Sequence, residues 1–274
     1  MIKSLFSLEE KTAIITGAAG YFGSSFSNCL LSCGASVILI GRGEKTLKLK
    51  QSLESKYGSK VKHYLVDFYD TKSYIDTLEE IVKKDYKIDV LINNSFDFSK
   101  ETGFNDPSGR MERMSKIQWM SSLESGIYWH ALAIQYIGEI MKSRNTGSII
   151  NVSSMYGVVA PDPYLYEDTD LFNPPSYGTA KAGLLALTRY TASFYGKYNI
   201  RCNALVPGSF PNMNQEAYNA PADDKFIEKL KNKTIFHRLG KVEDLLGALI
   251  FLASDSSSYM TGQSIVIDGG WVIK

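Results

Sequence analysis

The sequence lacks the features that mark secreted, membrane-spanning or metal-binding proteins. Its three cysteines, Cys29, Cys33 and Cys202, are an odd number without C-x-x-C spacing, so reduced thiols are expected rather than disulfides. No apolar run approaches the roughly 20 residues that span a bilayer, and charge at Glu9 precedes any long apolar run. The three histidines are far apart, and no metal-ligand spacing is visible. These absences predict a cytoplasmic protein with no membrane partner and no metal.

An excess of charge of one sign is also missing. The chain has 30 basic and 29 acidic residues, so no field favours nucleic acid or an anionic membrane. Apolar residues make up 44% and charged residues 22% of the 274 positions, as in an ordinary protein with a substantial core. The length fits a single domain over residues 1–274, although two small domains are possible on length alone.

Short β-branched segments alternate with longer amphipathic ones along the chain. The expected strands are residues 12–16, 36–40, 61–66, 90–93, 148–152, 201–206 and 264–268. The expected helices cover residues 22–33, 47–53, 74–81, 117–141, 177–195 and 242–252. This alternation predicts an α/β fold, with a doubly wound parallel sheet of about seven strands and helices on both faces.

A glycine-rich stretch, TGAAGYFG at residues 16–23, falls between the first expected strand and the first expected helix. Gly17, Gly20 and Gly23 are spaced three apart. Backbone N–H groups at a helix N-terminus bind anions, and glycine lets the backbone approach a pyrophosphate. Such turns also occur without a ligand, so the stretch by itself is weak evidence for a Rossmann-type dinucleotide site.

Further motifs make the resemblance specific. With NVSS at 151–154, SYGTAK at 176–181, NALVPG at 203–208 and the stretch 238–270, nearly the whole chain resembles the short branch of the short-chain dehydrogenase/reductase family. The glycine spacing, with Tyr21 where the middle glycine of the family stands, resembles the extended, sugar-nucleotide branch. The resemblance implies one NAD(P)-binding domain that transfers hydride between nicotinamide and a carbonyl or alcohol of a small molecule.

Three residues match the catalytic positions of the family. Tyr177 corresponds to the tyrosine of Y-x-x-x-K, which exchanges a proton with the substrate oxygen. A free tyrosine has a pKa of about 10, and Lys181, one helical turn away, is expected to favour the tyrosinate. The resemblance also implies that Lys181 binds the nicotinamide ribose and that Ser154 orients the substrate oxygen. The alternative is an ordinary exposed helical tyrosine and lysine.

The cofactor-binding residues are carried over from the family in the same way. Asp67 is expected to contact adenine, the alternative being that it caps the helix that begins near Thr71. Pro207 and Gly208 are expected to pass the nicotinamide, and the amide of Asn212 to bind its carboxamide. The full predicted set is Gly17, Gly20, Tyr21, Phe22, Gly23, Arg42, Asp67, Phe68, Asn93, Asn94, Ser95, Tyr177, Lys181, Pro207, Gly208, Phe210 and Asn212.

Arg42 carries the prediction of cofactor preference. NAD-specific sites usually place an acid on the ribose 2′-hydroxyl at the end of the second strand, and residues 40–42 contain no carboxylate. The guanidinium of Arg42 suits a 2′-phosphate. NADP(H) is therefore favoured, with NAD(H) as the alternative and a solvated loop arginine as the simplest other explanation.

Two positions depart from the family. Phe96 replaces the glycine of N-N-A-G, and Leu123 stands where many relatives have an asparagine that supports a proton relay. Water or another polar group could take that role, or turnover could be slow. These departures leave open a non-catalytic nucleotide-sensing protein, and more remotely a structural subunit of a hetero-oligomer. The intact Ser154, Tyr177 and Lys181 argue against a sensor, which has no need of them.

An insertion at about residues 155–176 points to the substrate. Ser154 and Tyr177 are 23 positions apart, more than is usual in the short branch. Prolines exclude a long helix between them, and the segment supplies aromatic faces and hydrogen-bond acceptors: Tyr164, Tyr166, Phe172, Glu167, Asp168 and Asp170. If the insertion roofs the site, this mixture suits a sugar, sugar acid or activated sugar better than a fatty chain. The alternative is a loop that only covers the subunit surface.

Aromatic residues also suggest self-association. The helix expected at 117–141 and the chain end carry more aromatic and apolar side chains than one core face needs: Trp119, Tyr128, Trp129, Leu132, Tyr136, Trp271 and Val272. Trp271 and Val272 are expected to be exposed. The resemblance then implies a homotetramer, with a homodimer as the second choice. The alternative is that these side chains pack inside the monomer.

Overall fold

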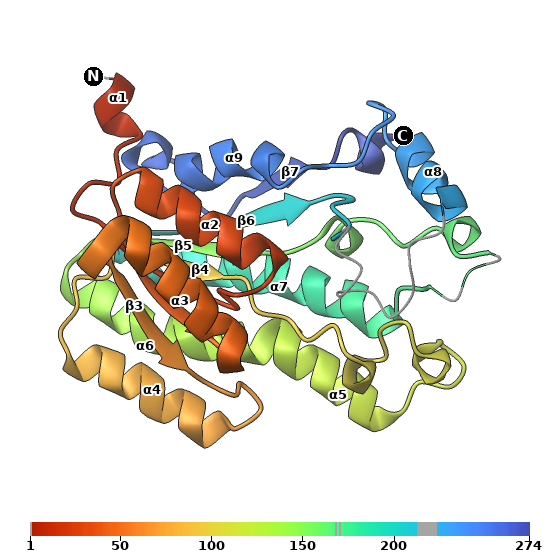
Figure 1. Ribbon diagram of the computed structural model, residues 1–274, viewed down its shortest axis with the longest axis horizontal. Coiled ribbons are helices and arrows are strands. Elements are labelled where there is room, and N and C mark those ends of the chain that lie inside the picture. Colours follow the sequence, from red (N-terminus) through yellow and green to blue (C-terminus); the bar gives the residue numbers. More distant parts are fainter. Residues whose placement is uncertain (1, 168, 170, 213–223) are drawn as a thin grey trace.

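The computed structural model describes residues 2–167, 169, 171–212 and 224–274. Its strands form one parallel sheet in the order β3-β2-β1-β4-β5-β6-β7 (Figure 1). The strands are β1 Thr12–Thr16, β2 Ser36–Gly41, β3 Val61–Leu65, β4 Val90–Asn93, β5 Gly147–Val152, β6 Ile200–Pro207 and β7 Ser264–Ile267. The predicted fold class is confirmed.

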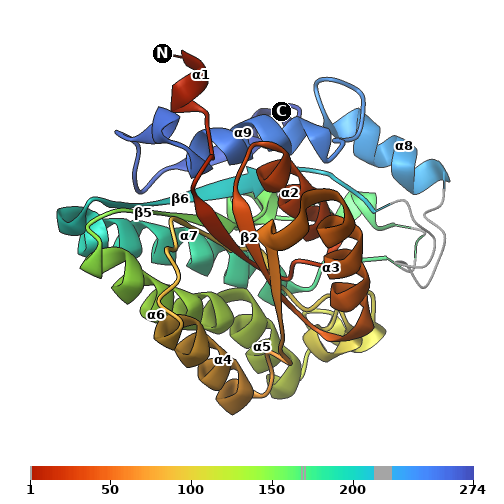
Figure 2. The same cartoon turned by 60° about the vertical axis from the view of Figure 1, so that its left-hand side comes forward.

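Helices cover both faces of this sheet (Figure 2). On one face lie α2 Tyr21–Ser32, α3 Gly43–Tyr57 and α9 Glu243–Ala253. On the other face lie α4 Thr71–Lys83, α6 Trp129–Ser143 and α7 Pro175–Tyr195, with α5 Lys116–Leu123 beside α7. Two helices were not expected from the sequence, the short α1 Ile2–Leu5 and α8 Asp224–Lys233.

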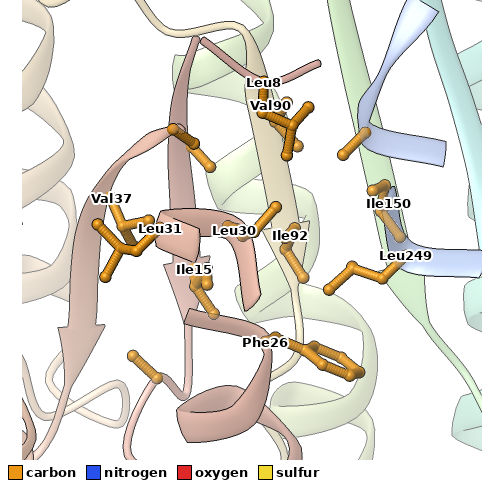
Figure 3. Close-up of a cluster of buried hydrophobic side chains, with 14 of the residues drawn as sticks. Leu8, Ile15, Phe26, Leu30, Leu31, Val37, Val90, Ile92, Ile150 and Leu249 are labelled. Carbon is orange, nitrogen blue, oxygen red and sulfur yellow. The ribbon is translucent and has the colours of Figure 1, made fainter. Parts of the chain in front are cut away.

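Each strand sends its side chains alternately into two cores. In β1, Ile15 enters the core under α2 and α9, where it meets Phe26, Leu30 and Leu249 (Figure 3). Its neighbour Ile14 enters the opposite core under α4 and α6. Burying such side chains contributes roughly 1.5–3 kcal/mol each, so a sheet covered on both faces needs apolar residues at nearly every strand position.

The long middle helix is less regular than expected. It runs as α5, a π-helical segment Glu124–Tyr128 and then α6. Gly126 lies in the π segment, and a Cβ added there would come within 2.6 Å of the Ala180 Cβ on α7. Glycine therefore lets this helix approach α7 closely, and π segments often mark functional sites.

The prediction that surplus aromatic and apolar side chains lie on the surface for self-association is wrong for three residues. Trp129 and Leu132 are buried in the core against α4. Trp271 is only 7% exposed and packs edge-on to Tyr156, with ring centroids 6.5 Å apart. It is covered because α8, which the sequence did not predict, closes a separate apolar cluster over the chain end. Tyr128 remains exposed.

No helix in the described part of the chain is both long and apolar enough to cross a membrane. The same residues contain no cluster of histidine, cysteine and acidic side chains that could hold a metal ion.

One buried histidine joins the middle helix to the end of β4. His130 on α6 is fully buried, and its Nε2 lies 2.7 Å from the carbonyl oxygen of Ser95, so Nε2 carries the proton that this bond needs. Burial and, to a smaller extent, the nearby charge of Lys181 lower the pKa of His130 to about 3, although the bond to Ser95 opposes both. His130 is therefore neutral in the folded protein.

This neutrality predicts acid sensitivity. Below the usual histidine pKa of 6.5 the unfolded chain takes up a proton that the folded chain refuses until about pH 3. His130 should therefore remove about 2 kcal/mol of folding stability between roughly pH 6.5 and pH 4.5. In His130→Gln, whose side-chain amide can still donate to Ser95, that loss should disappear. Urea unfolding of both proteins across this range is the measurement, and parallel stability curves would contradict the prediction.

Candidate functional site

The predicted site residues gather at the carboxyl-terminal edge of the sheet. β1 pairs with β2 on one side and β4 on the other, so the chain crosses over in opposite directions there. Ligands of open parallel sheets bind outside such a switch point. The predicted site residues that lie one or two positions after the strand ends at this edge are Gly17, Arg42, Asp67, Asn94, Ser154 and Gly208.

The glycine loop is built so that side chains would not fit. Gly17 has φ +63°, and a Cβ there would come within 2.8 Å of the Ser95 Cα. A Cβ on Gly23 would come within 2.3 Å of the Gly17 carbonyl oxygen. Gly20 is the N-cap of α2, and no side chain caps this helix. The first N–H groups of α2 are therefore left for an anion at the edge of the sheet.

Hydrogen bonds join this loop to the end of β4. The Asn94 side-chain amide donates to the carbonyl oxygens of Thr16 and Gly17, at 3.3 Å and 3.1 Å. The Thr16 hydroxyl oxygen accepts from the backbone N–H groups of Asn94 and Ser95, at 3.1 Å and 3.3 Å. The buried hydroxyl oxygen of Ser95 has no partner among the described residues. Thr16, which the sequence did not single out, fixes the two loops relative to each other.

Two predicted cofactor residues turn their side chains into the protein. Phe68 is buried and packs against Tyr74 and Trp129. Asn93 is fully buried and its amide donates to the Asn151 side chain at 2.8 Å. The roles of Phe68 and Asn93 toward a cofactor stay predictions.

Asp67 and Arg42 lie at the ends of neighbouring strands. Asp70, not Asp67, is the N-cap of α4 and accepts from the Ser73 N–H at 3.0 Å, so the capping alternative for Asp67 is excluded. Arg42 precedes α3 with its side chain about half exposed, and its Nη2 lies 4.0 Å from a carboxylate oxygen of buried Asp97. The roles of Asp67 and Arg42 toward a cofactor stay predictions.

The segment after β6 packs against the start of α2 at the same edge of the sheet. Phe210 meets Phe22 of α2 edge-on, with ring centroids 5.8 Å apart, while exposed Tyr21 packs on Phe22 at 5.4 Å. A Cβ on Gly208 would lie 2.5 Å from the Asp268 Cα, so this turn also requires glycine. Asn212 is the last described residue before the gap at 213–223.

Ser154, Tyr177 and Lys181 come together beneath this edge. Ser154 follows β5, whereas Tyr177 and Lys181 lie one turn apart at the start of α7, which begins with Pro175 at its first position. Their exposed fractions are 7%, 9% and 3%. Lys181 Nζ donates to the Val152 carbonyl oxygen at 2.9 Å. The alternative of an ordinary exposed tyrosine and lysine is therefore excluded.

Burial shifts the two titrating groups in opposite directions. It raises the pKa of Tyr177 to about 12, an effect that a hydrogen bond with Ser154 opposes and the neighbouring Tyr166 reinforces. It lowers the pKa of Lys181 to about 7. Near neutral pH the proton therefore stays on the Tyr177 hydroxyl, where it can be given to an oxygen held by Ser154.

Three phenylalanines surround Tyr177, and the sequence did not predict this. Phe96, Phe98 and Phe104 all come from the segment between β4 and α5, with ring centroids 5.1 Å, 5.9 Å and 5.1 Å from that of Tyr177. Phe96 was noted only as a departure from the family. Nothing in the spacing of Phe98 or Phe104 shows that they approach a residue so distant along the chain.

The insertion lies beside Tyr177 and is tied to its surroundings. Its Tyr166 hydroxyl is 3.1 Å from that of Tyr156, and both residues belong to the apolar cluster that contains Tyr177. Lys229 Nζ of α8 donates to the carbonyl oxygens of Tyr164 and Glu167, at 3.1 Å and 2.9 Å. The Glu167 side chain is exposed, and Asp168 and Asp170 lie outside the described residues.

Comparison with known proteins agrees with this geometry. The family model described as enoyl-(acyl carrier protein) reductase matches residues 17–272. The chain is 30% identical to the 7alpha-hydroxysteroid dehydrogenase of Bacteroides fragilis, over 97% of this chain and 95% of that protein. It is also 30% identical to the gluconate 5-dehydrogenase of Gluconobacter oxydans, over 98% of each.

A solved structure has the same fold. It is assigned as an NAD(P)-dependent gluconate 5-dehydrogenase from Beutenbergia cavernae, with NADP bound at low occupancy. It is 26% identical, covers 98% of this chain and 100% of that one, and superposes with a TM-score of 0.85. With the family model spanning nearly the whole sequence, the chain belongs to the short-chain dehydrogenase/reductase family.

Proposed function

We propose that this protein is an NADP(H)-dependent oxidoreductase that interconverts a carbonyl and an alcohol on a sugar, sugar acid or activated sugar. The observation that carries the proposal is the meeting of Ser154, Tyr177 and Lys181 in a site almost closed to water, at the sheet edge that also holds the uncapped α2. Family membership supports the more general function of an NAD(P)(H)-dependent oxidoreductase, whatever its substrate.

The residues at the edge fit a nicotinamide dinucleotide. The N–H groups that open α2 suit the pyrophosphate, because no side chain caps this helix. Gly17 lets the loop lie against the backbone of Ser95, since a Cβ there would come within 2.8 Å of the Ser95 Cα. The unpaired hydroxyl of Ser95 lies next to this loop. When bound, the cofactor supplies or accepts the hydride.

The side chains of the protein supply the proton. In the reductive direction the Tyr177 hydroxyl donates to the substrate oxygen while Ser154 holds that oxygen by a hydrogen bond. The Lys181 ammonium stabilises the tyrosinate that results, and exclusion of water strengthens this attraction. A non-catalytic nucleotide sensor gains no support, since a sensor needs none of these three groups in place.

The insertion is the argument for a sugar-like substrate. Relatives named for a steroid and for gluconate are equally similar, so identity does not choose between them. The insertion places two tyrosine hydroxyls, those of Tyr156 and Tyr166, in the same cluster as Tyr177. Hydroxyls beside aromatic faces suit a polyhydroxylated ligand better than a fused hydrocarbon.

A carbonyl panel tests the proposed function. NADPH absorbance is followed with aldonic keto acids, ketohexoses, a nucleotide-linked keto sugar, a ketosteroid and a 3-oxoacyl thioester. Turnover of the sugar derivatives supports the substrate class. Turnover of only the steroid or the thioester refutes it, and no turnover of any carbonyl refutes the oxidoreductase.

We also propose a homotetramer, or failing that a homodimer. Exposed apolar side chains remain on the adjacent helices α5 and α7 and on the π segment between α5 and α6: Ile117, Met120, Tyr128, Tyr190 and Phe194. Such a patch on a monomer is a common mark of an interface. Light scattering at micromolar concentration should give a multiple of 30.5 kDa, and a monomer mass would overturn the proposal.

Tyr177→Phe keeps the ring and removes the proton donor. Turnover on the best carbonyl should fall by at least ~10²-fold, because general acid catalysis contributes about that much. NADPH affinity should stay nearly unchanged, whereas Lys181→Ala should weaken both. Steady-state kinetics and a fluorescence titration of NADPH make the comparison, and full activity in Tyr177→Phe would assign the proton donor elsewhere.

Arg42→Ala tests the preferred cofactor. The unmodified protein should bind NADPH more tightly than NADH, since a guanidinium at the end of β2 pairs with a 2′-phosphate. The substitution should weaken NADPH binding by about tenfold or more and leave NADH binding nearly unchanged. Arg42→Lys keeps the positive charge but loses the paired donors of the guanidinium, so its NADPH affinity should lie between those of the unmodified protein and Arg42→Ala. Equal affinities for the two cofactors in the unmodified protein would contradict the prediction.

A further inference from the structure

Phe96 touches both titrating groups of the site. The Nζ atom of Lys181 lies 5.1 Å from the centroid of the Phe96 ring. The ring of Tyr177 meets Phe96 edge-on, with centroids 5.1 Å apart and an interplanar angle of 79°. An ammonium within about 6 Å of an aromatic centroid is attracted by the negative face of the ring. Phe96 therefore interacts electrostatically with Lys181 as well as filling space.

The surroundings hold the Phe96 ring in one orientation. Phe98 and Phe104 pack edge-on against it, with centroids 4.9 Å and 5.9 Å away. On the other side is Gly126 of the π segment, where an added Cβ would come within 3.2 Å of the Phe96 Cε2 atom. The ring thus lies between α7 and the middle helix, which it meets at Gly126, one helical turn after Leu123.

Lys181 has few other partners. Within the described part of the chain, the Lys181 ammonium makes one hydrogen bond, the donation to the Val152 carbonyl oxygen at 2.9 Å, and no carboxylate lies within ion-pair distance of it. An ammonium carries three donors, and a buried one without a counter-ion is costly. Among the described residues, the further contacts that favour the charged ammonium are the face of Phe96 at 5.1 Å and, more weakly, the ring of Tyr177 at 5.8 Å.

We propose that Phe96 is a positioning residue of the active site, whose ring holds the charged Lys181 against Tyr177 where the usual asparagine is absent at Leu123. This inference rests on the proposed oxidoreductase function for its purpose. Its physical content, the stabilisation of charged Lys181 by the ring, does not depend on any substrate.

The other titratable groups near this pair are neutral. His130 of α6 has its pKa lowered to about 3, chiefly by burial. Tyr156 and Tyr166, which act on Tyr177 from the insertion, both have their pKa raised by burial. A change in the titration of Lys181 after substitution of Phe96 therefore reports the loss of the ring rather than the titration of a neighbour.

The test titrates Lys181 directly. In full-length protein with carbon-13-labelled lysine, the Lys181 signal is assigned by its loss in Lys181→Met and followed by NMR from about pH 5 to pH 10. Phe96→Leu should lower the midpoint of Lys181 by about one pH unit, because it removes the cation–π attraction and keeps an apolar side chain. Phe96→Tyr, which keeps the ring, should leave the midpoint in place.

Phe104→Leu is the matched control. Phe104 contacts Tyr177 at the same 5.1 Å and packs on Phe96, but it has no recorded contact with Lys181. It should therefore move the Lys181 midpoint less than Phe96→Leu does, because it loosens the packing of the Phe96 ring but leaves the ring in place. An unmoved midpoint in Phe96→Leu, or an equal shift in Phe104→Leu, overturns the proposal. Thermal melts check that each variant folds, and Phe96→Met replaces Phe96→Leu if the latter does not.

Activity supplies a second, separable readout. In alcohol oxidation the acid limb of the pH profile should move up by about one unit in Phe96→Leu, since a neutral Lys181 no longer favours the tyrosinate. It should not move in Phe96→Tyr, and it should move less in Phe104→Leu than in Phe96→Leu. An unmoved limb in Phe96→Leu would overturn the link to Tyr177. If no alcohol or carbonyl reacts, the proposed function fails while the titration of Lys181 still decides the role of Phe96.

Discussion

The burial of an ammonium group next to a phenol is the constraint on which this site depends. Water is nearly excluded from Lys181 and Tyr177. Burial lowers the pKa of Lys181 to about 7, and it is the main cause that raises the pKa of Tyr177 to about 12. Both shifts favour the neutral forms. Tyr177 therefore keeps its proton, and Lys181 more readily loses the positive charge that would stabilise the tyrosinate. The contacts of Val152, Ser154 and Phe96 are therefore the ones that set whether the pair can exchange a proton.

The fold places these groups by bringing chain segments to one edge. Parallel strands end together, so loops separated by more than a hundred residues meet outside β1, β4, β5 and β6. The bonds of Asn94 to Thr16 and Gly17 fix the glycine loop to the end of β4. Two residues later Phe96 reaches α7, so the segment that secures the cofactor loop also contacts Lys181. A displacement of this segment would disturb both.

The sequence predicted the strands well because each is a short apolar run that a two-sided sheet must bury. It also predicted that Tyr177 and Lys181 share a helix face, since a spacing of four is local. It did not predict α8, a largely polar helix whose buried side chains pack in the same apolar cluster as Trp271. Because α8 was missing from the prediction, Trp271 was expected to be exposed, whereas it is buried. The ring cluster of Phe96, Phe98 and Phe104 is set by tertiary packing, which no periodicity encodes.

The insertion is held in place beside Tyr177 by contacts with two other segments. Lys229 of α8 donates to two of its carbonyl oxygens, and Lys233 of α8 pairs with Asp162. From the other side, Arg110 of the segment before α5 lies over the ring of Phe172. The insertion is thus held between α8 and the segment that carries Phe96, Phe98 and Phe104. Its position beside Tyr177 therefore depends on tertiary contacts that the catalytic motifs do not reveal.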